Sequence, residues 1–460
     1  MADQGGYDIV ILGGGSGGYA CALRAAELGK RVALIEKDKV GGTCLHRGCI
    51  PTKALLHAGE VADQTRESAA FGVHASLDGI DMTGVNAYKD KVVSRLFRGL
   101  TGLVASRHIE VIEGDGRLVS PTAVQVGDRL VEGAHVVLAS GSEARSIPGL
   151  EIDGQRIITS DHALQLDRVP ASVVILGGGV IGVEFASIWR SFGAEVTIVE
   201  MLPHLLPLED ESSSRLLERA FRRRGIGFKT GTRFEGVKEN GSGVTVTLEG
   251  GASLEAELML VAVGRGPVSA GLGYEEAGVE IERGGYVKVD ELCRTNVPAI
   301  SAVGDLTPGP QLAHVGFGEG ILVAERLAGL TVTPIDYHGV PRVTYSDPEV
   351  ASVGLTSAAA AERGIATNEV TYDLAGNGKS QILQTSGAAK VIAAAEGGEV
   401  LGIHLVGARV GELIAEGQLI YNWDATPSDV AQLIHPHPTQ SEIIGEAHLA
   451  LAGKPLHFHS

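Results

Sequence analysis

A strand–glycine–helix–strand pattern occurs twice in the 460-residue chain and constrains its fold more than any other feature. In the first copy, an apolar run is followed by Gly13, Gly15 and Gly18, then by an Ala-rich helical stretch and a second apolar run that ends at Glu36. In such a unit the first glycine makes a tight turn, the second lets a pyrophosphate approach the backbone, and the third lets the helix pack on the strand. The acid bonds the ribose hydroxyls. The pattern therefore indicates a dinucleotide site.

The second copy carries Gly177, Gly179 and Gly182 and ends at Glu200. In both copies the acid follows the first glycine by 23 residues (36 minus 13, and 200 minus 177). One copy could be an ordinary glycine-rich turn of an α/β sheet, because 64 residues of the chain are glycine. Two copies in the same register favour two sites, which suit a flavin and a nicotinamide cofactor. No Arg or Lys follows Glu200 in the run EMLPH, so the second site favours NAD over NADP.

Two cysteines, Cys44 and Cys49, lie in the run GGTCLHRGCIPTK just after the first pattern. A metal site would need further ligands at suitable spacing, which favours a redox disulfide and no metal. Residues five apart in a regular helix are too distant for a disulfide, so we expect a helix distorted near Gly48 and Pro51. We also expect Thr43 to cap this helix and its N-terminus to lower the thiol pKa values.

Composition and charge narrow the functional classes. The net charge of −18 makes nucleic acid an improbable partner, because the surface would repel phosphate backbones. No run of about 18 apolar residues indicates membrane insertion, and the N-terminus lacks the basic start of a signal peptide. A cytoplasmic location is therefore expected.

In order along nearly the whole chain, these motifs resemble the pyridine nucleotide–disulfide oxidoreductase family, and most closely its dihydrolipoamide-oxidising members. The matching runs are the first glycine turn, GGTC with GCIPTK, ASGS, GGGVIGVEFA, VAVGR, AVGDL, LAHVGFGEG and HPHPTQSE. The resemblance implies FAD at the first glycine turn and NAD at the second. It implies that Cys49 lies against the flavin and that Cys44 faces a dithiol substrate, dihydrolipoamide or a lipoyl domain.

The resemblance also assigns further residues. It implies that Lys53 pairs with Glu184 near the flavin, although a lysine at this position could equally be a solvated helix residue. It places the remaining cofactor-binding residues at Gly116, Asp305, Ala313 and Gly264. Two departures are His46-Arg47, where Asn-Val is more usual, and Val268, where Asn is common.

The histidine motif HPHPTQSE places His437 five residues before Glu442, which allows the carboxylate to reach the imidazole. Histidine-rich loops are more often surface features, and only the resemblance makes His437 an acid/base oriented by Glu442 and supplied by the other subunit of a homodimer. His435 is expected to be structural, and a helix is expected over 428–434, just before the motif.

The expected fold is α/β, with two Rossmann-like dinucleotide-binding domains and a C-terminal α+β interface domain. We predict an FAD domain over 1–147, an NAD domain over 148–270, a central domain over 271–345 and an interface domain over 346–460. In the last of these, a hairpin is expected over 389–407 and an apolar-faced helix over 411–423.

Two other classes stay open: related disulfide reductases, which usually take NADPH, and a non-catalytic flavoprotein acting as a redox sensor or structural subunit. The expected enzyme would be a component of a 2-oxo acid dehydrogenase complex, and the sequence does not say which one.

Overall fold

The computed structural model describes residues 6–458. The chain divides into two compact units that interleave in sequence. Unit 1 comprises the residues up to 54 together with 83–145 and 264–337, and unit 2 comprises 55–82, 146–263 and the residues from 338 onward.

Unit 1 is built on a seven-stranded sheet of order β3-β2-β1-β6-β5-β4, with β17 paired to β6. Its strands are β1 (Tyr7–Leu12), β2 (Val32–Glu36), β3 (Glu110–Glu113), β4 (Gly116–Ser120), β5 (Ala123–Val126), β6 (Arg129–Leu138) and β17 (Ile300–Ala302). The pairs that join β3, β2, β1, β6 and β17 are parallel, and β4 and β5 extend the sheet antiparallel. This is the first predicted dinucleotide-binding sheet.

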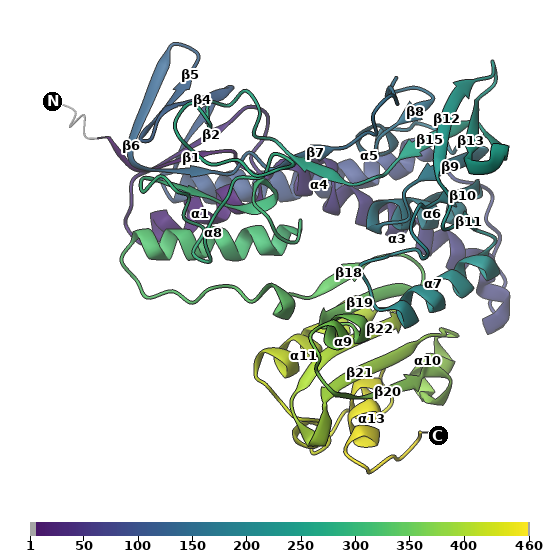
Figure 1. The fold of residues 1–460 in the computed structure, drawn as a ribbon. Helices are drawn as coiled ribbons and strands as arrows, with labels where there is room; N and C mark the ends of the chain where they lie inside the picture. The colour runs from purple at the N-terminus through teal and green to yellow at the C-terminus, as the bar shows by residue number, and fades with distance from the viewer. Residues whose placement is uncertain (1–5, 459–460) are drawn as a thin grey trace. The chain divides into compact units, whose positions relative to one another are not determined.

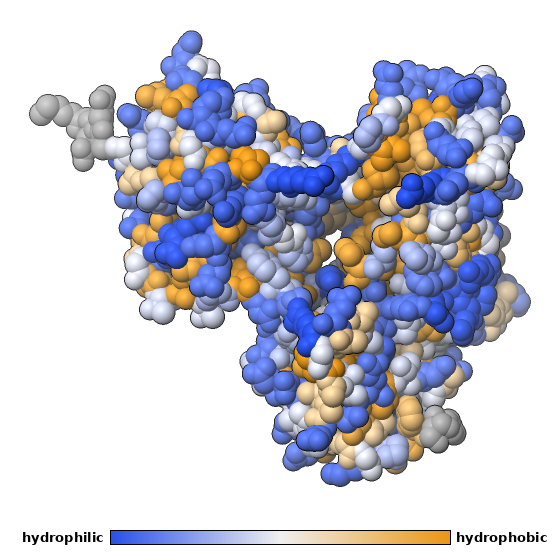
Figure 2. All heavy atoms as spheres, viewed as in Figure 1, coloured by the Kyte–Doolittle hydropathy of each residue, from blue (hydrophilic) through white to orange (hydrophobic). Residues whose placement is uncertain are grey.

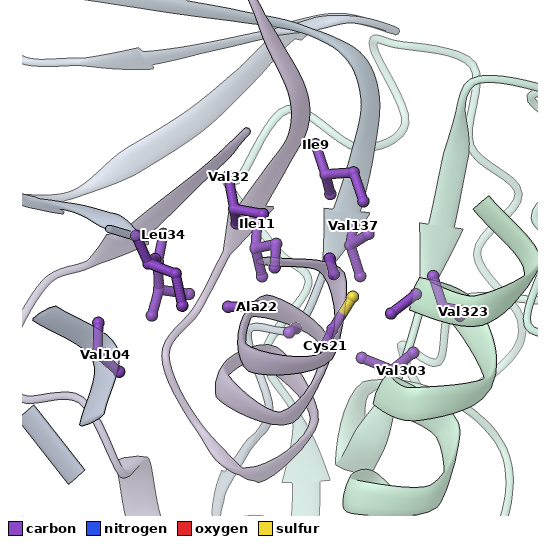
Figure 3. Close-up of a cluster of buried hydrophobic side chains, with 14 of the residues drawn as sticks. Ile9, Ile11, Cys21, Ala22, Val32, Leu34, Val104, Val137, Val303 and Val323 are labelled. Carbon is purple, nitrogen blue, oxygen red and sulfur yellow. The ribbon is translucent and has the colours of Figure 1, made fainter. Parts of the chain in front are cut away.

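Helices α1 (Ser16–Glu27) and α8 (Ala313–Leu327) lie side by side against this sheet (Figure 1). Their buried side chains join those of β1 in one apolar cluster, which Figure 3 shows around Ile9, Ile11, Cys21 and Val323. Cys21 is fully buried there, as expected for a cysteine that serves only as a small apolar core residue.

Unit 1 also holds the segment that carries the cysteines. It begins with helix α2 (Gly42–Arg47) and continues into α3 (Cys49–Glu67), which passes into unit 2 at residue 55, and the long helix α4 (Met82–Ser106) lies in unit 1 from residue 83 onward. Two short strands, β7 (Ser142–Ala144) and β16 (Arg265–Pro267), pair antiparallel.

Unit 2 contains the second predicted dinucleotide-binding sheet, a five-stranded parallel sheet of order β11-β10-β9-β15-β8. The strands are β8 (Ile157–Ile158), β9 (Ser172–Leu176), β10 (Glu195–Val199), β11 (Gly227–Lys229) and β15 (Leu258–Val261). Helix α6 (Val180–Phe192) follows β9, and α7 (Glu211–Arg224) precedes β11. Between β11 and β15 in sequence, the chain forms a three-stranded antiparallel sheet of β12 (Phe234–Glu239), β13 (Val244–Leu248) and β14 (Ser253–Ala256).

The C-terminal part of unit 2 is a five-stranded antiparallel sheet of order β18-β19-β22-β21-β20. Its strands are β18 (Arg342–Thr344), β19 (Glu349–Gly354), β20 (Thr367–Asp373), β21 (Ala388–Ala394) and β22 (Val400–Gly407). Helices α11 (Val410–Asn422) and α13 (Glu442–Leu451) contribute to the apolar core on this sheet. The predicted hairpin is β21–β22, and the predicted apolar-faced helix is α11. The α/β fold with a C-terminal α+β part is thus confirmed.

One local prediction is too long. A helix is expected just before the HPHP motif, and α12 (Pro427–Val430) ends well before it. Residues 431–433 form a turn and a bend instead of continuing the helix, so the helix covers only the first part of the expected range.

The surface carries both hydrophilic and hydrophobic areas on the face seen in Figure 2. In the C-terminal part of unit 2 several large apolar side chains are exposed, among them Trp423 (74%), Leu433 (61%) and Ile434 (98%). Within residues 6–458, no helix is both long enough and apolar enough to cross a membrane.

Candidate active site

The first glycine turn has a geometry that separates the roles of its three glycines. Gly13 has φ +110°, and a Cβ there would lie 2.2 Å from the Ala139 carbonyl oxygen. A Cβ at Gly18 would lie 1.9 Å from the Gly13 carbonyl oxygen. At Gly15 the nearest atom to such a Cβ is 4.0 Å away. The fold itself therefore requires the outer glycines, and the middle one leaves space that a ligand can fill.

The second turn repeats this arrangement. Gly177 also has φ +110°, with a Cβ position 2.3 Å from the Ala262 carbonyl oxygen, and a Cβ at Gly182 would lie 2.0 Å from the Gly177 carbonyl oxygen. At Gly179 no atom lies within 4 Å of the Cβ position. Close contacts within the protein thus require glycine at 177 and 182, whereas the middle glycine, Gly179, leaves space that a ligand can fill.

The acid at the end of each pattern is fixed by two backbone amides. Glu36 accepts from the Gly14 N–H at 2.7 Å and from the Asp38 N–H at 2.9 Å. Glu200 accepts from the Gly178 N–H at 2.6 Å and from the Leu202 N–H at 2.7 Å. Each carboxylate keeps further lone pairs for a hydroxyl donor. The two glycine turns, each with its acid, can thus bind two dinucleotides through the same set of contacts.

The cysteine helix α2 packs directly on the first glycine turn. Gly41, at φ +110°, precedes the helix, and its N–H donates to the Gly14 carbonyl at 2.8 Å. A Cβ at Gly42 would lie 2.6 Å from the Gly15 Cα. The predicted cap at Thr43 is wrong, because Gly41 occupies the N-cap position and Thr43 is already inside the helix.

The helical path breaks between the two cysteines, as disulfide geometry requires. Gly48, at φ −143° and ψ −113°, ends α2, and α3 begins at Cys49. The expected distortion near Gly48 is confirmed. Pro51 lies in the first turn of α3, where its missing N–H costs no helical hydrogen bond.

Both cysteines are present as free thiols, and they interact with each other. The hydrogen bond with Cys49 and then burial raise the pKa of Cys44 above its usual range, and the positive charge of Lys53 opposes this shift. The expected lowering of the thiol pKa is therefore wrong for Cys44. Burial, followed by the neighbouring thiols, raises the pKa of Tyr19 to about 12, which identifies Tyr19 as a neighbour of the pair.

Three other predicted flavin contacts lie in unit 1. Asp305 accepts from the Ser142 hydroxyl at 2.5 Å, and the Arg265 Nε donates to that hydroxyl at 2.8 Å. Asp305 also influences the Cys44 thiol electrostatically. Ala313 is the first residue of α8, where backbone N–H groups are free of helical partners. Gly116 begins β4 and packs against Leu12, so that its small size has a structural reason as well.

The histidine motif forms a hydrogen-bonded pair in unit 2. The His437 Nδ1 lies 2.8 Å from the Glu442 Oε1, and the His437 side chain is 77% exposed. The second carboxylate oxygen of Glu442 accepts from the Thr439 N–H at 2.8 Å. By contrast, His435 is 11% exposed and pairs with Glu416 at 2.7 Å, as expected of a structural residue.

The remaining predicted residues fall on different units. Lys53 is half-buried one turn after the start of α3, in unit 1. Glu184 is buried on α6 in unit 2, where it accepts from the Tyr345 N–H at 3.0 Å. Gly264, at φ +113°, belongs to unit 1, whereas the second glycine turn belongs to unit 2. The Lys53–Glu184 pair and the role of Gly264 stay predictions.

Sequence reasoning missed a cavity beside the first site. It has a volume of about 360 Å³, and its walls include Glu36, Asp38, Val40 and Phe97. Only Glu36 carried a sequence signal. Phe97 comes from α4, far along the chain, and no local pattern marks it as a neighbour of residues 36–40.

Comparison with known proteins agrees with this arrangement. Residues 7–320 match the pyridine nucleotide-disulphide oxidoreductase family, and residues 340–448 match its dimerisation domain. The chain is 40% identical to the dihydrolipoyl dehydrogenase of Bacillus subtilis, over 98% of this chain and 99% of that protein. It is 39% identical to the mitochondrial dihydrolipoyl dehydrogenase of Pisum sativum, over 98% and 92% of the two chains.

Solved structures give the same result. LpdA from Mycobacterium tuberculosis superimposes with a TM-score of 0.90 at 29% identity, covering 96% of this chain and 99% of that one. The HOCl-induced flavoprotein disulfide reductase RclA from Escherichia coli, in its Cu(II) complex, gives 0.88 at 28% identity, covering 97% and 100%. With both glycine turns and the cysteine pair inside the matched range, the chain belongs to the pyridine nucleotide-disulphide oxidoreductase family.

Proposed function

We propose that this enzyme oxidises dihydrolipoamide to lipoamide and reduces NAD to NADH through a Cys44–Cys49 redox disulfide. As a member of its family, the chain is an oxidoreductase whose cofactors are FAD and NAD. The observation that carries the proposal is the packing of the cysteine helix on the first glycine turn, with Gly42 against Gly15. It supports a redox pair next to a bound dinucleotide.

The chain's own residues supply the two cofactor sites. Gly15, Glu36, Gly116, Asp305 and Ala313 would hold FAD in unit 1, and Lys53 would lie near its ring. Gly179 and Glu200 of unit 2 would hold NAD, and the family resemblance adds Gly264 of unit 1 as a further NAD-binding residue. Bound FAD supplies a two-electron carrier between a thiol reaction and a nicotinamide.

The dithiol reaction would use His437 and the cysteines. His437 takes a proton from one substrate thiol, and Glu442 orients the imidazole through its 2.8 Å contact. The substrate thiolate attacks the Cys44 sulfur and releases Cys49 as a thiolate, which leaves a mixed disulfide on Cys44. The second substrate thiol displaces Cys44, so that the substrate leaves as a cyclic disulfide and both cysteines are reduced.

A homodimer would complete this site. The matched dimerisation domain includes His437, and the side chains of Leu433 and Ile434 just before it are exposed. Large exposed apolar side chains in one region are typical of a surface that another chain covers. His437 would then serve the cysteine pair of the other subunit.

The finer assignments follow from this function. We place the FAD domain at 1–147, the NAD domain at 148–270, the central domain at 271–345 and the interface domain at 346–460. The substrate would be the reduced form of lipoamide, free or on a lipoyl domain of a 2-oxo acid dehydrogenase complex in the cytoplasm.

Steady-state turnover tests the proposal. The enzyme should reduce NAD with dihydrolipoamide and show little activity with glutathione disulfide and NADPH, since Glu200 would repel a 2′-phosphate. Preference for the second pair would assign the chain to the glutathione-type reductases. Tight FAD binding with no turnover of either pair would instead favour a redox sensor.

A further inference from the structure

His46 and Arg47, the last two residues of α2, each contact the loop that follows Glu36. The His46 Nε2 lies 3.0 Å from the Val40 carbonyl oxygen. Since a carbonyl only accepts, His46 must donate from an Nε2–H. Arg47 forms an ion pair with Asp38 through its guanidinium. Both contacts lie within unit 1.

His46 makes a third contact, with helix α4. Its ring meets the Phe97 ring edge-on, with ring centroids 5.1 Å apart and an interplanar angle of 75°. This T-shaped arrangement is favourable for aromatic pairs. The end of α2 is therefore held on two sides immediately before the chain breaks at Gly48.

All three partners line one cavity. Asp38, Val40 and Phe97 belong to the walls of the cavity of about 360 Å³ that Glu36 also lines. The Asp38 N–H also donates to Glu36, which fixes the loop to the dinucleotide-binding acid. A continuous set of contacts thus joins that acid to the helix that carries Cys44.

We propose that His46 and Arg47 are positioning residues that hold Cys44 beside Cys49 in the dithiol state. This inference rests on the proposed function, because it assumes that the pair alternates between dithiol and disulfide. A disulfide restricts both cysteines, whereas a dithiol restricts neither. An anchored helix end removes freedom from the dithiol in advance, so less entropy is lost when the disulfide forms. The anchors therefore favour the disulfide.

Arg47 could instead act through its charge, and that alternative predicts a different pattern of redox shifts in the variants. Arg47 and Asp38 are about half exposed and neutralise each other, so the net field at Cys44 is small. If the ion pair acts as an anchor, Arg47→Gln and Asp38→Asn both shift the equilibrium toward the dithiol. If the Arg47 charge acted on a thiolate, the two variants would shift it in opposite directions.

The test measures the redox equilibrium of the cysteine pair in the FAD-loaded protein. Wild type and variants are equilibrated without oxygen in mixtures of reduced and oxidised dithiothreitol, quenched with acid, alkylated and analysed by peptide mass. We expect His46→Ala to shift the equilibrium constant toward the dithiol by about 3- to 10-fold and Arg47→Gln by about 2- to 5-fold. Arg47→Lys, which keeps the ion pair, should stay near wild type, as should Arg98→Gln, a change at an exposed position of α4.

His46→Gln keeps the proposal testable if His46→Ala does not fold. It retains an N–H donor for Val40 and loses the ring contact, so an intermediate shift is expected. Unchanged equilibria in His46→Gln and Arg47→Gln, or opposite shifts in Arg47→Gln and Asp38→Asn, would overturn the inference. A wild-type pair that never interconverts would instead overturn the proposed function.

Discussion

The middle glycine of the second turn offers a direct way to separate binding from folding. At Gly179 the backbone has φ −76° and ψ −175°, which alanine adopts freely, and no protein atom lies within 4 Å of a Cβ. Gly179→Ala should therefore change the free energy of unfolding by less than about 1 kcal/mol. Gly182→Ala places its methyl group 2.0 Å from the Gly177 carbonyl oxygen and should cost about 1–3 kcal/mol.

Gly179→Ala should weaken NAD binding, although it leaves the free energy of unfolding almost unchanged. The new methyl group occupies the space left for the pyrophosphate, and we expect NAD to bind the oxidised enzyme at least about tenfold more weakly, or about 1.4 kcal/mol. Denaturant unfolding and calorimetric titration with NAD measure the two quantities. Gly236→Ala is the matched control, because its Cβ position in β12 is also open. Wild-type NAD affinity in Gly179→Ala, or a loss of stability equal to that of Gly182→Ala, would exclude this role for Gly179.

Three further predictions address the chemistry and one buried charge. Cys49→Ser should abolish the long-wavelength absorbance of a thiolate against oxidised flavin, whereas Cys44→Ser should retain it; a band that persists in Cys49→Ser sinks this division of roles. His437→Gln should slow dihydrolipoamide oxidation by about 10²-fold or more, and Glu442→Gln by about 10-fold, in steady-state assays; unchanged turnover argues against the pair. Burial alone would raise the pKa of Asp210, but hydrogen bonds from the Ser212 hydroxyl and the Ser357 N–H, together with the charge of half-buried Lys390, lower it. Its stabilisation is therefore present above about pH 4 and lost as the pH falls through its folded pKa. Asp210→Asn should cost about 2–4 kcal/mol at pH 7 by denaturant unfolding, and a difference that does not shrink in acid contradicts this.

The glycine turns could be predicted in detail because their constraints are local. Gly13 and Gly177 need positive φ, and the acids at Glu36 and Glu200 lie at a spacing set by one strand–helix–strand unit. The break at Gly48 could likewise be predicted, because the Cα atoms of residues five apart in a regular helix are too distant for a disulfide.

Other features depend on long-range packing and left no local signal. The Thr43 cap was wrong because Gly41 at positive φ lets α2 pack on the first turn, a contact between segments far apart in sequence. The pKa of Cys44 rises because its thiol forms a hydrogen bond with Cys49 in a half-buried position. Phe97 reaches His46 from α4, and no pattern near either residue indicates that contact.

Electron transfer through the Cys44–Cys49 pair can be tested directly. Oxidised, FAD-loaded enzyme should be treated without oxygen with one equivalent of dihydrolipoamide, quenched, alkylated and mapped by mass. We expect Cys44 and Cys49 to resist alkylation before treatment and both to be alkylated after it, while buried Cys21 serves as an internal reference. Two cysteines that are already alkylated before dihydrolipoamide is added, or that stay blocked while the flavin is reduced, would contradict it.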